Sequence, residues 1–141
     1  MSDDYEHRSL DELETNPEKP GHRWELSPQL GIEDYNVNVA VVAPGERLSQ
    51  NAYHYHPNQA EFYYLVAGRC RVEVEDGSFD AEIDDMVRFD AGVPHMLHNP
   101  YEDECKILAI GSPPEGRRPV HQVRSYEELL ADRYGADGAS S

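Results

Sequence analysis

The sequence contains little lysine, little cysteine and no long hydrophobic run. Of its twelve basic residues only two are lysine, and the formal net charge of the 141 residues is −16. A surface this acidic repels phosphate groups, which argues against nucleic acid as a direct partner and against docking on an anionic membrane. The longest apolar run, residues 39–43, is far too short to span a bilayer.

The acidic residues are spread along the whole chain. Two interpretations compete: an acidic docking face for a cationic partner, and a halophilic-type surface adapted to concentrated salt. At ~1 M ionic strength the Debye length is about 3 Å, so repulsion between carboxylates is screened. The even spread and the scarcity of lysine favour a salt-adapted cytoplasmic protein. The N-terminus is acidic and lacks an apolar segment, so we expect no secretory signal.

Several reactive motifs are absent. Cys70 and Cys105 do not form a CxxC pair, and they can form either one disulfide or two buried thiols, of which a cytoplasmic chain favours the thiols. No GxGxxG, Walker A, GxSxG or HExxH pattern occurs. Their absence excludes the usual nucleotide-binding, serine-hydrolase and metalloprotease interpretations.

The first two parts of the chain differ in composition and in hydrophobic pattern. Residues 1–30 are polar and interrupted by prolines, which predicts an extended N-terminal arm with one short helix beginning near Ser9. Residues 31–114 carry short β-type runs between turn residues, such as the alternating run 36–41 and the hairpin turn Asp76-Gly77. Many short strands without intervening helices predict an all-β antiparallel sandwich or barrel.

The third part is a tail, residues 115–141. Ser125 followed by helix-forming residues predicts a short C-terminal helix. The residues from Gly135 onward are expected to be disordered. The sequence therefore predicts one barrel domain that is flanked by an arm and a tail.

Four of the seven histidines lie in two short stretches of the predicted barrel. His54 and His56 are two residues apart on a predicted strand, so their side chains share a face and can chelate one ion. The proline that follows interrupts the strand, which allows Glu61 to return to the same centre. His95 lies on a later strand, from which a third imidazole can arrive. By spacing alone, a His-X-His pair also fits packing or surface roles.

Two motifs resemble those of the cupin superfamily. The first is a His-X-His pair followed after four residues by glutamate and after six more by glycine: His54-Tyr55-His56, Glu61 and Gly68. The second keeps every spacing of the family pattern: Asp84, Asp90, Gly92, His95 and Asn99. Asp84 and Asp90 replace a glycine and a proline of that pattern, and eight residues separate Gly45 from His54 where the family pattern has five. The resemblance covers residues 36–111.

The resemblance implies a double-stranded β-helix, the jelly-roll barrel of cupins. It also implies that His54, His56, Glu61 and His95 bind one divalent transition metal. A set of three histidines and one glutamate suits Fe, Mn, Ni, Zn or Cu better than Ca or Mg, which prefer oxygen ligands. With four protein ligands, an octahedral ion keeps two positions for water or substrate.

Other polar residues lie near these motifs. Tyr63 has the same strand parity as Glu61 and is expected to face the pocket. Gln59 and Asn99 are pocket candidates that can orient ligands, although turn hydrogen bonds are the simpler interpretation for both. His98 follows His95 by three residues, so it points to the other face of a strand and is not expected to be a ligand.

Cupins with this ligand set include dioxygenases, decarboxylases and isomerases. We therefore expect a metal-dependent enzyme that acts on a small polar molecule. The alternative is a non-catalytic module or sensor that binds a metal and a small-molecule ligand. A third hypothesis is a barrel whose histidines serve only in packing. We also expect a homodimer, to which the first thirty residues can contribute a strand.

Overall fold

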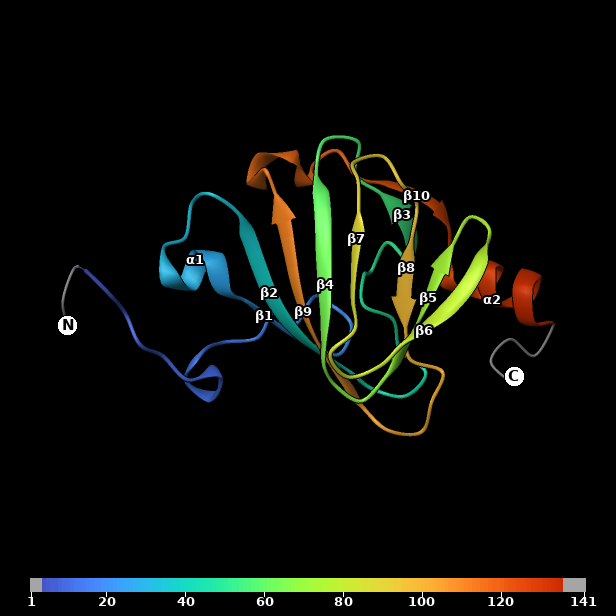
Figure 1. Cartoon of the computed structure of the whole chain (residues 1–141), viewed down its shortest axis with the longest axis horizontal. Helices are drawn as coiled ribbons and strands as arrows, with labels where there is room; N and C mark the ends of the chain where they lie inside the picture. Colours follow the sequence, from blue (N-terminus) through green and yellow to red (C-terminus); the bar gives the residue numbers. More distant parts are fainter. Residues whose placement is uncertain (1–3, 136–141) are drawn as a thin grey trace.

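The computed structural model describes residues 4–135 and is built mainly of antiparallel strands (Figure 1). Within these residues the strands are β1 (His22–Glu25), β2 (Asn36–Val42), β3 (Tyr53–Tyr55), β4 (Ala60–Ala67), β5 (Cys70–Val74), β6 (Gly77–Ala81), β7 (Met86–Phe89), β8 (Met96–His98), β9 (Cys105–Ser112) and β10 (His121–Arg124). The helical segments are η1 (Leu10–Glu12), α1 (Leu26–Leu30), η2 (Pro114–Arg117) and α2 (Tyr126–Tyr134).

The strands form two layers. The larger sheet has the order β1-β2-β9-β4-β7, and the remaining strands form the sheet β6-β5-β8 and the pair β10-β3. A backbone bridge between His54 and His95 continues the pair into the three-stranded sheet. Strands that are distant in sequence lie side by side, as in a double-stranded β-helix. The predicted all-β jelly-roll fold is thus confirmed.

The core lies between the two layers, because alternate side chains of each strand face inward. Leu65 of β4, Val72 of β5 and Ile107 of β9 are at most 1% exposed and belong to one hydrophobic cluster. Cys70 and Cys105 lie in the same cluster, and both are free and buried. The interpretation of the cysteines as buried thiols is therefore confirmed.

The segment predicted as an extended arm contributes a strand to the larger sheet. β1 pairs with β2 in antiparallel register, with Trp24 opposite Val39. α1 follows at once and ends at Gly31, whose φ of 68° is left-handed. The helix expected near Ser9 is a single 3-10 turn. The strand that we expected to be available to a partner subunit is used within the chain, and the homodimer itself stays a prediction.

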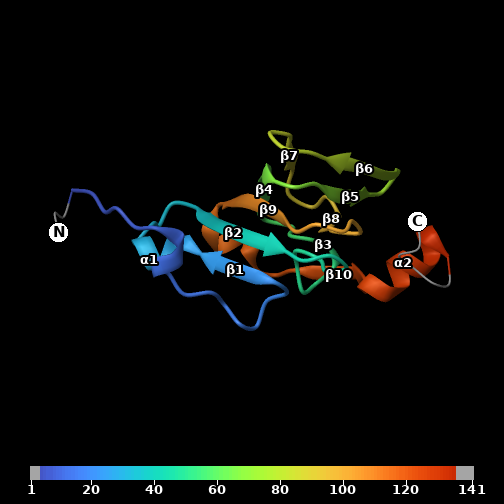
Figure 2. The ribbon, with the colours of Figure 1, turned by 90° about the horizontal axis from the view of Figure 1, so that it is seen from below.

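The tail begins within η2 and runs to α2, which lies at the opposite end of the molecule from α1 (Figures 1 and 2). Its strand β10 pairs with β3, a pairing that the sequence did not predict. The predicted C-terminal helix is confirmed as α2, where Ser125 and Glu128 cap each other reciprocally. Most of the segment expected to be disordered, residues 136–141, lies outside the described residues. None of the helices within residues 4–135 has the length and apolarity to cross a membrane.

Candidate metal centre

Two histidines of neighbouring strands are held side by side by their backbones. His54 lies in β3, and His95 directly precedes β8. Each backbone N–H donates to the carbonyl of the other residue, with N···O distances of 3.1 Å from His54 and 2.9 Å from His95. Residues paired in this way project their side chains to the same face. The two ring centroids are accordingly 4.9 Å apart.

All three candidate histidines present the same ring nitrogen to the centre. Their Nδ1 atoms lie 2.8–2.9 Å from backbone carbonyl oxygens: those of Ala52 for His54, Arg117 for His56 and Val93 for His95. A carbonyl oxygen can only accept a hydrogen bond, so each Nδ1 carries a proton. Each Nε2 atom therefore has a free lone pair that can bind a metal ion. The backbone contacts also fix the orientation of each ring.

Glu61 of β4 places its carboxylate among these nitrogens. Its Oε1 lies 3.0 Å from His95 Nε2 and 3.7 Å from His56 Nε2. Its Oε2 accepts a hydrogen bond of 2.7 Å from the Tyr63 hydroxyl. The short separation between Glu61 and His95 places a nitrogen of His95 and an oxygen of Glu61 where both could bind one ion.

Burial and neighbouring groups set the ionisation of the centre. Burial lowers the pKa of His54 to about 4, and His95 acts in the same direction. Burial alone raises the pKa of Glu61, but interactions with His95 and Tyr63 outweigh it and lower this pKa to about 2. Burial and the Glu61 carboxylate raise the pKa of Tyr63 well above its usual value. At neutral pH, His54 is therefore neutral, Glu61 is ionised and Tyr63 is protonated.

This donor set fits a divalent transition metal. One ligand atom from each of His54, Glu61 and His95 lies within 4.8 Å of the other two. Ligands that surround one ion at about 2.1 Å lie up to about 4 Å apart, so the observed group is close to a coordinating arrangement. His56 stands beside the group, with its ring centroid 5.0 Å from that of His54. Three of the four predicted ligands thus form a compact group, and the fourth borders it.

The three predicted pocket residues have different positions. Tyr63 and Gln59 line a cavity beside the candidate ligands, and Asn99 does not. Gln59 Nε2 donates to the carbonyl of Pro113 at 3.1 Å, so its amide is bonded to the segment that leads into the tail rather than to a candidate ligand. Asn99 is fully buried and donates to two backbone carbonyl oxygens at 2.9 and 2.8 Å. This corrects the pocket prediction for Asn99, which stabilises a turn.

His98, which we expected not to be a ligand, belongs to a separate buried cluster. Its Nε2 lies 2.7 Å from Glu73 Oε2, and both residues are buried. Arg133 of α2 donates to the other carboxylate oxygen at 2.9 Å, and the hydroxyl of Tyr134 donates to Glu73 as well. The cluster fastens α2 to β5 and β8.

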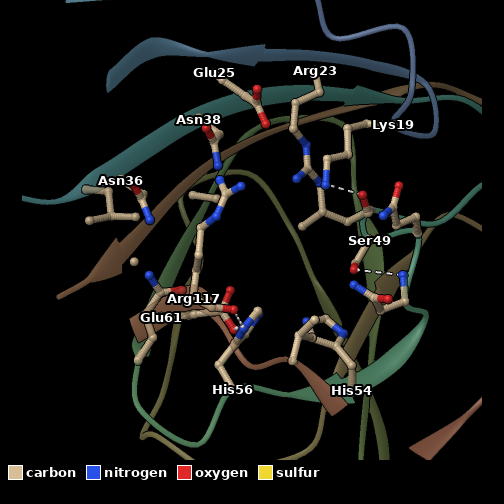
Figure 3. Close-up of a pocket in the computed structure, with 18 of the residues that line it drawn as sticks. Lys19, Arg23, Glu25, Asn36, Asn38, Ser49, His54, His56, Glu61 and Arg117 are labelled. Carbon is tan, nitrogen blue, oxygen red and sulfur yellow. Dashed lines mark hydrogen bonds and ion pairs between the residues drawn. The ribbon is translucent and has the colours of Figure 1, made fainter. Parts of the chain in front are cut away.

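The cavity beside the candidate ligands has a volume of about 200 Å³. Figure 3 shows His54, His56 and Glu61 on one side of it, with Lys19 and Arg23 on the opposite side. The sequence pattern did not reveal the two cations, because it predicted an arm outside the barrel for their segment. The only local feature that could have located these cations is β1. It is four residues long, which is too short for its pattern to predict a strand.

Comparisons with known proteins identify the family of this chain. The family model described as "Cupin domain" matches residues 38–111, which include all four candidate ligands. Polyketide synthase CurC of Streptomyces cyaneus is 31% identical over 123 residues, which cover 86% of this chain and 78% of that protein. Protein SchB of Streptomyces halstedii is 33% identical over 102 residues, which cover 71% of this chain and 72% of that protein.

Solved structures share the fold. The polyketide cyclase RemF of Streptomyces resistomycificus has a TM-score of 0.74 and 16% identity, and the match covers 96% of this chain and 98% of RemF. A sugar phosphate isomerase of Silicibacter pomeroyi has a TM-score of 0.67 and 23% identity, with coverage of 75% and 74%. The jelly-roll topology, the spacing of the candidate ligands and the family-model match lead to one conclusion: this chain is a member of the cupin domain family.

Proposed function

We propose that this protein is a metal-dependent enzyme that acts on a small polar carbonyl compound. The observation that carries the proposal is the common orientation of three imidazoles. Each Nδ1 is held by a backbone carbonyl, so each Nε2 is available at one centre beside Glu61. Ligands held in this way are positioned before an ion binds. Three nitrogens and one carboxylate suit a single Fe, Mn, Ni, Zn or Cu ion.

A divalent ion bound here supplies Lewis-acid polarisation of a carbonyl oxygen. The residues of the chain shape its surroundings. Tyr63 stays protonated and donates to Glu61, which fixes the carboxylate. The ring of Phe89 stacks on His95, with centroids 4.1 Å apart and planes inclined by 6°. This stacking fixes the imidazole and excludes water from that side of it.

The relatives favour ring closure as the reaction to test first. CurC is described as a polyketide synthase and RemF as a polyketide cyclase. An aldol-type closure of a keto chain forms one carbon–carbon bond and moves one proton from carbon to oxygen, so it needs no oxidant. A polarised carbonyl is the group that the new bond requires. We therefore place cyclisation before the oxygenase, decarboxylase and isomerase reactions that the family also contains.

Metal content tests the first half of the proposal. Protein purified without chelator or affinity nickel is expected to carry a transition metal at close to stoichiometric amount, measured by mass spectrometry. His56→Ala is expected to lose most of it. His121→Ala removes an exposed histidine that does not line the cavity, and it is the control that retains the metal. A wild-type content below about a tenth of an equivalent contradicts metal dependence.

Enzymatic turnover of a carbonyl compound tests the second half of the proposal. A linear diketone that can close by aldol addition and then lose water to give a six-membered enone is incubated with the metal-loaded protein, and the enone absorbance is followed. We expect a rise in wild type that disappears after chelation and in His56→Ala. Oxygen uptake with acetylacetone tests the oxygenase reaction in parallel. If the loaded protein turns over neither compound but is stabilised by both, the result supports the alternative of a non-catalytic module that binds a metal and a small molecule.

A further inference from the structure

The cavity beside the candidate metal centre contains a large share of the positive charges of the chain. Four of the twelve basic residues line it: Lys19, Arg23, Arg117 and Arg118. Only two of the 28 acidic residues line it with them, Glu25 and Glu61. None of the four cations forms an ion pair with another residue in the range 4–135. In a chain of net charge −16, unpaired cations gathered on one concave surface indicate an anionic ligand.

Arg23 is positioned by β1, and its Nη2 donates to the carbonyl of Leu48. Its Nε is buried and has no hydrogen-bond partner among the described residues. A buried donor without a partner costs free energy, and Arg23 also lines the cavity, where a ligand oxygen could accept a hydrogen bond from its guanidinium group. Figure 3 shows Arg23 and Lys19 facing the cavity from the side opposite His54 and His56.

The two cations of the arm are partly desolvated. Burial lowers the pKa of Arg23, while Tyr63, Glu25 and Glu61 oppose the shift. Burial also lowers the pKa of Lys19, and the neighbouring Arg23 acts in the same direction. Attraction between a cation and an anion is stronger where water is excluded. An anionic group that enters this part of the cavity therefore relieves the repulsion between these cations.

The cations and the candidate ligands come from different parts of the chain. The ligands lie within residues 38–111, which the family model matches, whereas the four cations lie outside that range. β1 adds its cation at the edge of the larger sheet. The tail approaches the barrel closely, because a Cβ at Gly116 would lie 2.0 Å from the carbonyl oxygen of Asn58. The barrel thus supplies the candidate metal ligands, and the flanking segments supply the positive charges of the cavity.

We propose that Lys19, Arg23 and Arg117 bind an anionic oxygen group, a carboxylate or a phosphate, of a small substrate whose carbonyl lies at the metal centre. This inference rests on the proposed function, because the two groups of residues share one cavity. It adds the substrate class: a keto acid or keto phosphate in place of a neutral diketone. At about 200 Å³ the cavity is smaller than typical sites for drug-sized ligands, which measure about 300–1,000 Å³. It accommodates a small molecule or one end of a longer molecule.

The test compares charged probes with neutral counterparts of the same shape. Benzoate is compared with benzamide, and ribose phosphate with ribose, by NMR titration of the full chain. The titrations are done after chelation, so that binding to a metal does not contribute, and are repeated with zinc. We expect at least one anion to bind more tightly than its neutral counterpart in both states. The benzoate and ribose phosphate titrations distinguish a carboxylate from a phosphate.

Variants connect binding to the cations. Arg23→Gln is expected to weaken binding of the preferred anion about tenfold, because it removes a charge-assisted hydrogen bond. Arg117→Gln is expected to weaken it less, about threefold, since Arg117 is exposed and more strongly screened. Arg88→Gln makes the same change of charge at an exposed residue outside the cavity, and it is expected to bind like wild type. Folding is checked by the amide spectrum of each variant.

Three results overturn the inference. They are equal affinity of the wild type for a charged probe and its neutral counterpart in both pairs, unchanged binding in both Arg23→Gln and Arg117→Gln, and an equal loss in Arg88→Gln. Metal content is measured on the same samples and is expected to remain at the wild-type level in all three variants. Anion binding without metal contradicts the proposed function but not the anion subsite, whereas metal without anion binding contradicts the subsite alone.

Discussion

The backbones of His54 and His95 exchange both of their hydrogen bonds, so two candidate metal ligands form a directly opposed pair of an antiparallel ladder. Main-chain hydrogen bonds set the relative position of the two backbones, and stacking on Phe89 holds the His95 ring. Glu61 reaches the same centre from β4, which belongs to the larger sheet. An ion bound by all three residues therefore joins the two layers of the barrel.

Two histidines that lie three residues apart are expected to respond in opposite ways to the same substitution. His95→Gln removes a ligand and is expected to abolish most metal binding and the thermal stabilisation that added zinc confers. His98→Gln breaks the buried contact with Glu73 and is expected to lower the melting temperature while zinc still stabilises the variant. Melting curves with and without zinc measure both effects. Zinc stabilisation of His95→Gln equal to that of wild type contradicts the assignment.

The metal-free protein is expected to lose stability as the pH falls. The pKa of His54 is lowered from 6.5 to about 4, so between these values the unfolded chain binds a proton that the folded chain does not. The contribution of His54 to the free energy of unfolding is complete above pH 6.5. It is lost as the pH falls toward 4, at up to about 1.4 kcal/mol per pH unit. The lowered pKa of Glu61 acts in the same direction at lower pH. Urea unfolding at a series of pH values measures the slope, which is expected to be shallower in His54→Gln.

Glu73 is expected to be essential for the attachment of α2. It is 0% exposed and accepts hydrogen bonds from Arg133 and Tyr134 beside His98. Glu73→Gln leaves Arg133 without its counter-ion, so we expect a loss of about 3 kcal/mol in the free energy of unfolding. Hydrogen exchange is expected to accelerate in α2. Glu75→Gln, at an exposed residue nearby, serves as the control, and equal losses in the two variants would count against this role.

Two glycines with positive φ provide a matched steric comparison. Gly68 has a φ of 72°, and a Cβ there would lie 2.4 Å from the carbonyl oxygen of Glu104. Gly92 has a φ of 85° with open space around the corresponding position. Gly92→Ala is expected to cost about 1 kcal/mol for the left-handed backbone alone, and Gly68→Ala more than about 2 kcal/mol because the backbone must also move. Chemical unfolding measures both, and equal costs contradict the steric argument.

The acidic surface is expected to make stability increase with salt. Because the net charge is −16, repulsion between carboxylates opposes the compact state at low ionic strength. The melting temperature is expected to rise by several degrees between about 0.1 M and about 1 M potassium chloride, as the Debye length falls from about 10 to about 3 Å. Chloride is used because sulfate strengthens hydrophobic burial by itself. A melting temperature that does not depend on salt contradicts the salt-adapted interpretation.

The sequence alone predicted what depends on local pattern. Strand alternation and turn residues indicated an all-β sandwich or barrel, because the period of two and the turn preferences act within a few residues. The resemblance of two motifs to those of cupins implied the jelly roll. Asp84, which replaces a glycine of the cupin pattern, has a φ of 71°, a conformation that aspartate tolerates better than most residues. The cap at Ser125 likewise located the C-terminal helix.

Only the tertiary structure decided what depends on contacts between distant segments. The pairing of His54 with His95, the Arg117 carbonyl that orients His56 and the cations opposite the ligands each join parts of the chain that no local pattern relates. Hydrogen bonds and charge clusters of this kind arise from strand order and register. The candidate ligands could therefore be named from spacing and family motifs, whereas their tautomers and the charge of the cavity beside them required the folded chain.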